Sequence, residues 1–84
     1  MYFVYILLCA DGSLYTGITN DIDRRFLQHK NKKGGKYTAS HPVKKVVYSE
    51  EFKSRGDALK REFEIKTLRK ANKLKLIKGL IVTR

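Results

Sequence analysis

The side chain of Glu62 lies at an unexpected position in a predicted helix. On a helical wheel, the helix that follows Ser54 has a broad apolar sector made of Ala58, Leu59, Phe63, Ile65 and Leu68. Glu62 falls within this sector, whereas Glu64 points to the opposite, solvated side. A buried, unpaired carboxylate is costly. Glu62 could therefore pair with Lys66 one turn along the helix, or it could bind a hard divalent cation at the floor of a cleft.

Arg25 and His29 lie one helical turn apart in an earlier predicted helix, at the edge of the inner face marked by Ile22 and Phe26. Arg24 points away from this face. The forked donors of an arginine at such a rim can reach a phosphate. Alternatively, the stem of Arg25 could simply cover Phe26. His29 taken by itself is more typical of a hydrogen-bonded rim histidine than of a catalyst.

Tyr5 and Tyr15 lie on the two arms of a predicted β-hairpin, in which an apolar, aromatic run is followed by Asp-Gly and a second strand-forming run. A two-residue loop would pair Leu8 with Tyr15 and place the tyrosines on opposite faces. A three-residue loop, with Gly12 in the left-handed conformation, pairs Leu7 with Tyr15 instead. The two phenols are then diagonal neighbours, ~7–8 Å apart at Cα, and can share a ligand.

The elements that must position these side chains follow the order β-β-α-β-α(-α). We expect a small α+β domain in which a three-stranded, at least partly antiparallel sheet is flanked by helices. After the hairpin, the expected elements are a helix capped by Asn20 and ended by Gly34-Gly35, a polar loop over Lys36 to Pro42, a strand over Val43 to Phe52, a helix capped by Ser54 that runs to about Lys70, and a short helix that can cover Asn72 to Lys78.

The net charge restricts the classes of partner. The chain has 84 residues, which is the length of one domain, and 19 Lys and Arg against 8 Asp and Glu give a formal charge of +11. This excess favours a polyanion, with nucleic acid first and an anionic membrane surface or an acidic protein as alternatives. A basic surface that only confers solubility is the remaining alternative.

The single cysteine, Cys9, excludes an internal disulfide framework and a zinc site built with two distant histidines. A small buried side chain is the favoured interpretation of Cys9. The first apolar run lacks a basic leader and is too short to span a bilayer, so we expect a cytoplasmic protein.

The ordered set of these residues resembles the GIY-YIG nuclease superfamily over nearly the whole chain. The family's two triplets correspond to Val4-Tyr5-Ile6 and Tyr15-Thr16-Gly17. Arg25 follows Tyr15 by ten residues, His29 follows four later, and Glu62 matches the family's metal-binding glutamate. Gly34-Gly-Lys-Tyr-Thr38 is similar to standalone bacterial members of the URI type.

The sequence also departs from the family pattern. Val4 replaces the first glycine and Thr16 the second isoleucine, and neither change removes a catalytic group. Ile18 stands where some members have a lysine. Asn72 matches only weakly the asparagine that supports the site in some members, because its spacing from Glu62 differs.

The resemblance implies hydrolysis of DNA phosphodiester bonds, with Mg²⁺ or Mn²⁺ bound by Glu62. The expected substrates are branched, nicked or single-stranded DNA. The expected process is DNA repair or recombination, in which a protein partner could target the enzyme. Arg25 would stabilise charge on the phosphate, and Tyr5 or Tyr15 would activate or position the water. His29 would accept a proton or hold the phosphate. The residues expected to contact the DNA are Lys32, Lys33, Lys36, Tyr37, Lys44 and Lys45. A catalytically weak binding module of the same fold and a basic accessory protein are the alternatives.

Overall fold

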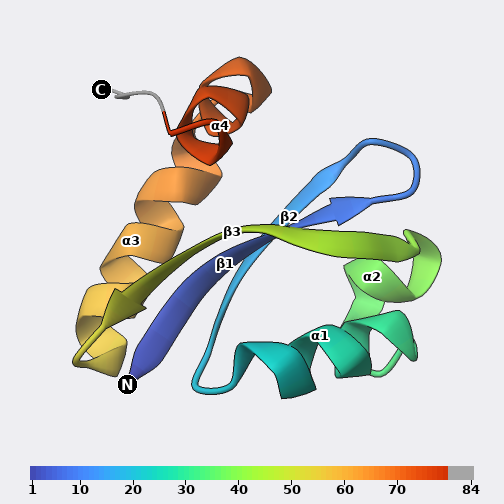
Figure 1. The fold of residues 1–84 in the computed structure, drawn as a ribbon, viewed down its shortest axis with the longest axis horizontal. Helices are drawn as coiled ribbons and strands as arrows, with labels where there is room; N and C mark the ends of the chain where they lie inside the picture. The colour runs from blue at the N-terminus through green and yellow to red at the C-terminus, as the bar shows by residue number, and fades with distance from the viewer. Residues whose placement is uncertain (80–84) are drawn as a thin grey trace.

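The computed structural model describes residues 1–79, which form a three-stranded antiparallel sheet with helices on both of its faces (Figure 1). The elements are β1 (Tyr2–Cys9), β2 (Leu14–Thr19), α1 (Ile22–Lys30), α2 (Lys36–Ser40), β3 (Val43–Phe52), α3 (Arg55–Thr67) and α4 (Lys70–Ile77). The strand order is β2-β1-β3. The predicted α+β class and the order β-β-α-β-α-α are therefore confirmed.

The hairpin between β1 and β2 has the three-residue loop that a shared tyrosine site requires. The amide of Cys9 donates to the carbonyl of Ser13 at 2.9 Å, and Gly12 adopts a left-handed φ of 87°. Leu7 consequently pairs with Tyr15, and Tyr5 pairs with Gly17. Because side chains alternate along a strand, Tyr5 and Tyr15 lie on the same face of the sheet.

The alternation along β1 divides the interior into two parts. Val4 and Ile6 are fully buried and pack against Ala58 and Ile65 of α3. The alternate side chains, including that of Tyr5, face the side of the sheet that α1 and α2 cover. Cys9 is buried with a free thiol, as expected. Helix α3 thus packs on one face of the sheet, and α1 and α2 lie on the other (Figure 1).

Helix α1 begins one residue later and ends earlier than the predicted boundaries. Asp21, rather than Asn20, is the N-cap, and its side chain accepts a hydrogen bond from the amide of Arg24 at 3.1 Å. The amide oxygen of Asn20 instead accepts a hydrogen bond from the Arg24 side chain. The helix ends at Lys30, and Lys32 takes the left-handed conformation before the two glycines are reached.

The segment predicted as a polar loop over Lys36 to Pro42 contains the short helix α2. Its turn is closed by backbone hydrogen bonds from Ala39 to Gly35 and from His41 to Tyr37. Thr38 in this turn bonds to His29, so a tertiary contact supports a helix that the local sequence does not favour. Ser54 caps α3 as predicted, but the helix ends at Thr67 rather than Lys70.

The sheet covers only part of the apolar sector predicted for α3. Ala58 and Ile65 are fully buried, whereas Phe63 is 70% exposed and Leu59 is 37% exposed. The buried face is centred on Ala58 and Ile65 and extends toward Arg61, which pairs with Glu50 of β3. Glu64 also pairs with Arg61, at 3.2 Å, and is partly buried rather than fully solvated. In this orientation Arg61 reaches Glu50 of β3, and Phe63 points outward.

Within residues 1–79, no helix has the length and apolar character needed to cross a membrane.

Candidate functional site

Three buried side chains from three elements form a hydrogen-bonded chain beneath α1 and α2. The hydroxyl of Tyr5 lies 2.9 Å from Nε2 of His29, and Nδ1 of His29 lies 2.6 Å from Oγ1 of Thr38. Tyr5 is 2% exposed, and His29 and Thr38 are 1% exposed. Both ring nitrogens of His29 are therefore used inside the protein. The histidine fixes the phenol of β1 relative to α1 and α2.

Burial keeps both members of the Tyr5–His29 pair neutral. It lowers the pKa of His29 from 6.5 to about 4, and the positive charge of Arg25 acts in the same direction. Burial also raises the pKa of Tyr5 from 10.0 to about 12, although Arg25 opposes this shift. His29 is thus neutral and enclosed, with both ring nitrogens hydrogen-bonded inside the protein, and its expected part in accepting a proton or holding a phosphate stays a prediction.

Two glycines allow the close approach of these rings. A Cβ atom on Gly17 would lie 2.6 Å from the hydroxyl oxygen of Tyr5 and 3.2 Å from a ring carbon of Tyr15. A Cβ atom on Gly34 would lie 2.7 Å from Cγ of His29. Such contacts are not tolerated without movement of a ring or of the backbone. Gly17 and Gly34 are therefore part of the site, although local sequence patterns indicate no chemical reason for either.

Tyr15 lies next to this chain and is only partly buried. Its ring centroid is 6.4 Å from that of Tyr5 and 5.1 Å from that of His29, which it meets edge to face. On its other side Tyr37 stacks at 5.8 Å, and His41 stacks on Tyr37 at 3.9 Å. Tyr37, predicted to contact DNA, is stacked between the rings of Tyr15 and His41 and remains 37% exposed.

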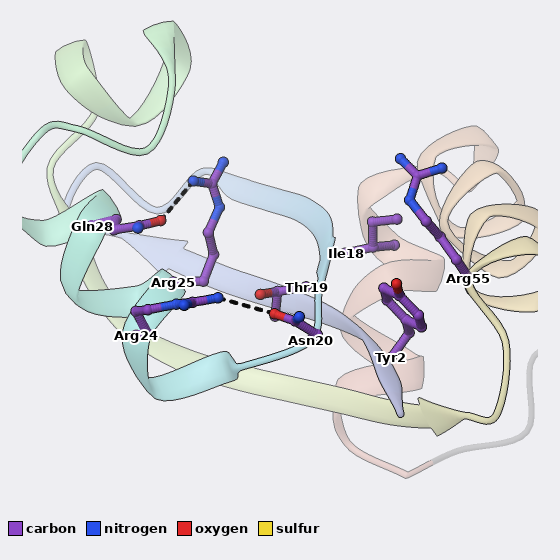
Figure 2. Close-up of a pocket in the computed structure, with 8 residues that line it drawn as sticks. All are labelled: Tyr2, Ile18, Thr19, Asn20, Arg24, Arg25, Gln28 and Arg55. Carbon is purple, nitrogen blue, oxygen red and sulfur yellow. Dashed lines mark hydrogen bonds between the residues drawn. The ribbon is translucent and has the colours of Figure 1, made fainter.

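Arg25 is held at the rim of the site by two hydrogen bonds. Its guanidinium donates to Oε1 of Gln28 at 2.9 Å and to the carbonyl of Gly34 at 2.6 Å. Its charge affects the pKa of both Tyr5 and His29, which places the guanidinium beside the buried pair. Arg24, as predicted, points elsewhere and bonds to Asn20 (Figure 2). Arg25 is therefore the arginine that can present donors next to the tyrosines.

Glu62 lies on α3 with 17% of its side chain exposed, and its Oε2 pairs with Nζ of Lys66 at 3.3 Å. The helix pair considered from the sequence thus forms. The negative charge of Glu62 also contributes to the raised pKa of Tyr5, after burial and after the effects of Tyr15 and Arg25. Glu62 is therefore close enough to the phenol to influence it, even though it extends from the helix that packs on the other face of the sheet.

The part of the chain that the structure describes holds no cluster of three or more His, Cys, Asp or Glu side chains suited to a metal. One partly exposed carboxylate still fits Mg²⁺, which commonly takes one or two protein carboxylates and fills its other positions with water and phosphate oxygens. The residues present thus fit a cation held by Glu62 together with a bound phosphate.

The remaining predicted positions lie outside this cluster. The five lysines, all exposed, are Lys32, Lys33, Lys36, Lys44 and Lys45. Asn72 lies in α4, where its backbone N–H donates to the carbonyl of Arg69, and no hydrogen bond within residues 1–79 joins its side chain to Glu62. Thr38 and Gln28 were missed, because their roles depend on the tertiary approach of α2 and on the orientation of Arg25.

A groove of about 340 Å³ adjoins the rim formed by Arg25. Figure 2 shows α1 on one side of it and the start of α3 on the other, with the end of β2 between them. Its lining residues are Tyr2, Ile18, Thr19, Asn20, Arg24, Arg25, Gln28 and Arg55.

The antiparallel sheet, the facing tyrosines and the adjacent Arg25, His29 and Glu62 define a GIY-YIG catalytic domain. The family model described as the GIY-YIG catalytic domain matches residues 1–75, and the chain belongs to this nuclease superfamily. Its relatives include UPF0213 proteins. The protein from Staphylococcus saprophyticus is 49% identical over 76 residues, which cover 90% of this chain and 93% of that protein. One from Staphylococcus aureus is 47% identical over 77 residues, covering 92% and 94%.

The fold is also similar to a solved structure. The solution NMR structure of a UPF0213 protein from Bacillus halodurans has a TM-score of 0.59 and 42% sequence identity, and the match covers 93% of this chain and 84% of that one.

Proposed function

We propose that this protein is a metal-dependent endonuclease that hydrolyses DNA phosphodiester bonds. The observation that carries the proposal is the convergence of Tyr15, Arg25 and Glu62 around a buried Tyr5–His29 pair. These residues provide a hydroxyl, a forked cation and a carboxylate, which are the groups that hydrolysis of a phosphodiester uses. The family to which the chain belongs supports the same activity.

The accessible groups have distinct roles in this proposal. Arg25, fixed by Gln28 and Gly34, would stabilise negative charge that develops on the phosphate. Tyr15 is more exposed than Tyr5, so its hydroxyl would contact and orient the attacking water. Glu62 would hold the divalent cation, Mg²⁺ or Mn²⁺, which supplies Lewis-acid stabilisation of the phosphate oxygens when bound.

The buried pair acts through its position. Tyr5 and His29 keep the wall beneath Tyr15 in place, because His29 meets Tyr15 edge to face and bonds to Tyr5. His29 is thus a positioning residue, and so is Thr38, which occupies its second ring nitrogen. A role in DNA repair or recombination, with or without a targeting protein, is consistent with a basic 84-residue chain but depends on the activity itself.

A cleavage panel tests the proposal. Wild type and Glu62→Gln are incubated with end-labelled branched, nicked and single-stranded DNA in Mg²⁺, in Mn²⁺ and in a chelator. We expect wild type to cut in metal only, and Glu62→Gln to lose at least about 100-fold of the rate while retaining DNA binding. Glu51→Gln, which removes an exposed carboxylate from β3, is the matched control and should cut normally. A wild type that binds these DNAs but cuts none would support the alternative of a binding module.

A further inference from the structure

The groove beside Arg25 carries a strong positive charge, of which the proposed cleavage chemistry uses only Arg25. Three of its eight lining residues are arginines, and none of the lining residues among the described positions is acidic. Its remaining surface is polar at Thr19, Asn20 and Gln28 and mainly apolar at Ile18 and Tyr2. Cationic walls with a partly apolar floor suit a phosphate attached to a sugar and base.

The two walls present their arginines from different elements. Arg24 extends from α1, where a hydrogen bond of 3.1 Å to Asn20 orients its guanidinium. Arg55 extends from the first turn of α3 across the groove (Figure 2). Within residues 1–79, Arg55 makes no hydrogen bond or ion pair, so its donors are available to a ligand.

Both walls continue into the candidate catalytic site. On the α1 side, Arg25 belongs to the groove and also lies beside Tyr5 and His29. On the α3 side, Arg55 precedes Glu62 by seven residues, which places the two on nearly the same face of the helix, separated by about 10 Å along its axis. A DNA strand that has one phosphate at Arg25 and Glu62 can therefore extend directly into the groove.

We propose that this groove is a second phosphate subsite, in which Arg24 and Arg55 hold the backbone phosphate of a nucleotide that neighbours the bond to be cleaved. The volume of about 340 Å³ lies at the lower end of the range for ligand pockets, roughly 300–1,000 Å³, which suits one nucleotide unit. The sugar and base of that unit lie against Tyr2 and Ile18. The inference deepens the proposed function, since it names how the same site holds its substrate.

DNA binding without metal tests the subsite separately from cleavage. The affinity of the full chain for a fluorescein-labelled duplex is measured by anisotropy in a chelator over a series of salt concentrations. We compare wild type with the double variant Arg24→Gln/Arg55→Gln. The matched control, Lys60→Gln/Arg69→Gln, removes the same charge from exposed positions outside the groove. All four side chains are exposed, so both variants should unfold at the wild-type temperature.

The groove variant should bind about tenfold more weakly, and the slope of log K against log salt should fall by about one, since the two arginines hold a single phosphate and each phosphate contact contributes about 0.9. The control should change both quantities much less. Equal losses in the two double variants would overturn the subsite, whether or not the wild type cleaves DNA. Conversely, a wild type without cleavage activity but with a selective loss in the groove variant would leave the subsite intact and refute the nuclease proposal.

A second experiment distinguishes binding of a phosphate within a DNA strand from binding of a free nucleotide. Backbone amide signals of Thr19 and Asn20 are followed by NMR during titration with the duplex, with deoxyadenosine monophosphate and with inorganic phosphate. If the groove binds a phosphate within a DNA strand, the duplex should shift these signals at a lower concentration than either small anion. If the mononucleotide or inorganic phosphate saturated the groove at a concentration where the duplex did not, the groove would be a small-anion site and the proposal would be wrong.

Discussion

The hydroxyl of Tyr5 and Nε2 of His29 lie 2.9 Å apart in a place that solvent barely reaches. The bond joins a residue of β1 to one of α1 that is 24 positions later in the sequence. Because Thr38 occupies the other ring nitrogen, the histidine links the hairpin to both helices that cover it. The same bond thus stabilises the fold and fixes the base of the candidate site.

Removing the two hydroxyls separately should distinguish the tyrosines. Tyr5→Phe leaves Nε2 of the buried His29 without its partner, so we expect the free energy of unfolding to fall by about 1–3 kcal/mol. Tyr15→Phe keeps the ring contacts of a partly exposed side chain and should change stability by less than about 0.5 kcal/mol. Urea unfolding followed by circular dichroism measures both values.

The same two variants test which phenol contacts the water. If Tyr15 orients the nucleophile, Tyr15→Phe should reduce cleavage by about 100-fold with little change in DNA affinity. Full cleavage by Tyr15→Phe, together with loss of activity in a folded Tyr5→Phe protein, would assign the role to Tyr5 instead.

The lowered pKa of His29 predicts a loss of stability in mild acid. In the unfolded chain the imidazole takes up a proton near pH 6.5, whereas in the folded protein it does so only near pH 4. Between these values the unfolded state binds more protons, so the contribution of His29 is complete above about pH 6.5 and is lost as the pH falls toward 4. The loss is on the order of 2 kcal/mol.

This pH effect is isolated by comparison with a variant. Urea unfolding of wild type and of His29→Gln is measured at several pH values from 4 to 7.5. The difference in unfolding free energy between the two proteins should shrink as the pH falls, because glutamine does not titrate and other groups act equally in both. A difference that stayed constant across this range would contradict the assignment.

Alanine substitutions at glycines should damage the site selectively. Gly17→Ala forces a methyl group onto the Tyr5 hydroxyl, and Gly34→Ala forces one onto the His29 ring. Each should destabilise the protein by about 1–3 kcal/mol and reduce cleavage. Gly56→Ala is the matched control, since an added Cβ atom there would meet nothing within 4 Å. Gly56 lies in α3, where alanine is favoured over glycine by up to about 1 kcal/mol, so this variant should not lose stability. Equal effects at all three glycines would show that crowding is not the cause.

The fold and part of the site follow from local sequence rules. The Asp-Gly signal and the strand pattern are sufficient to predict the hairpin, and the need for both tyrosines on one face selects the three-residue loop that is observed. The spacing of Arg25 and His29 correctly places them one turn apart, since α1 forms as a helix around them. Such features depend on residues close in sequence.

What the sequence does not reveal depends on contacts between distant elements. Local signals predict a loop where α2 forms, because the stability of this helix includes the bond between Thr38 and His29. The wheel assigns Phe63 to the buried face because it shows an apolar sector but not which part of that sector meets the sheet. In the structure Ala58 and Ile65 meet the sheet, and Phe63 is exposed. The groove is likewise formed only when Arg55 approaches α1.

Replacing Arg25 with lysine tests the rim that joins the catalytic site to the groove. A lysine keeps the positive charge but cannot donate from a rigid fork to both Gln28 and the carbonyl of Gly34. We expect Arg25→Lys to lower the cleavage rate by about 10²–10³-fold, which is the usual effect of losing a donor that stabilises charge in the transition state. The free energy of unfolding should fall by only about 1 kcal/mol. Arg69→Lys, at an exposed position before α4, should match wild type in both assays. Retention of full cleavage by Arg25→Lys would mean that charge alone is sufficient at this position and that the fixed geometry of the guanidinium is not used.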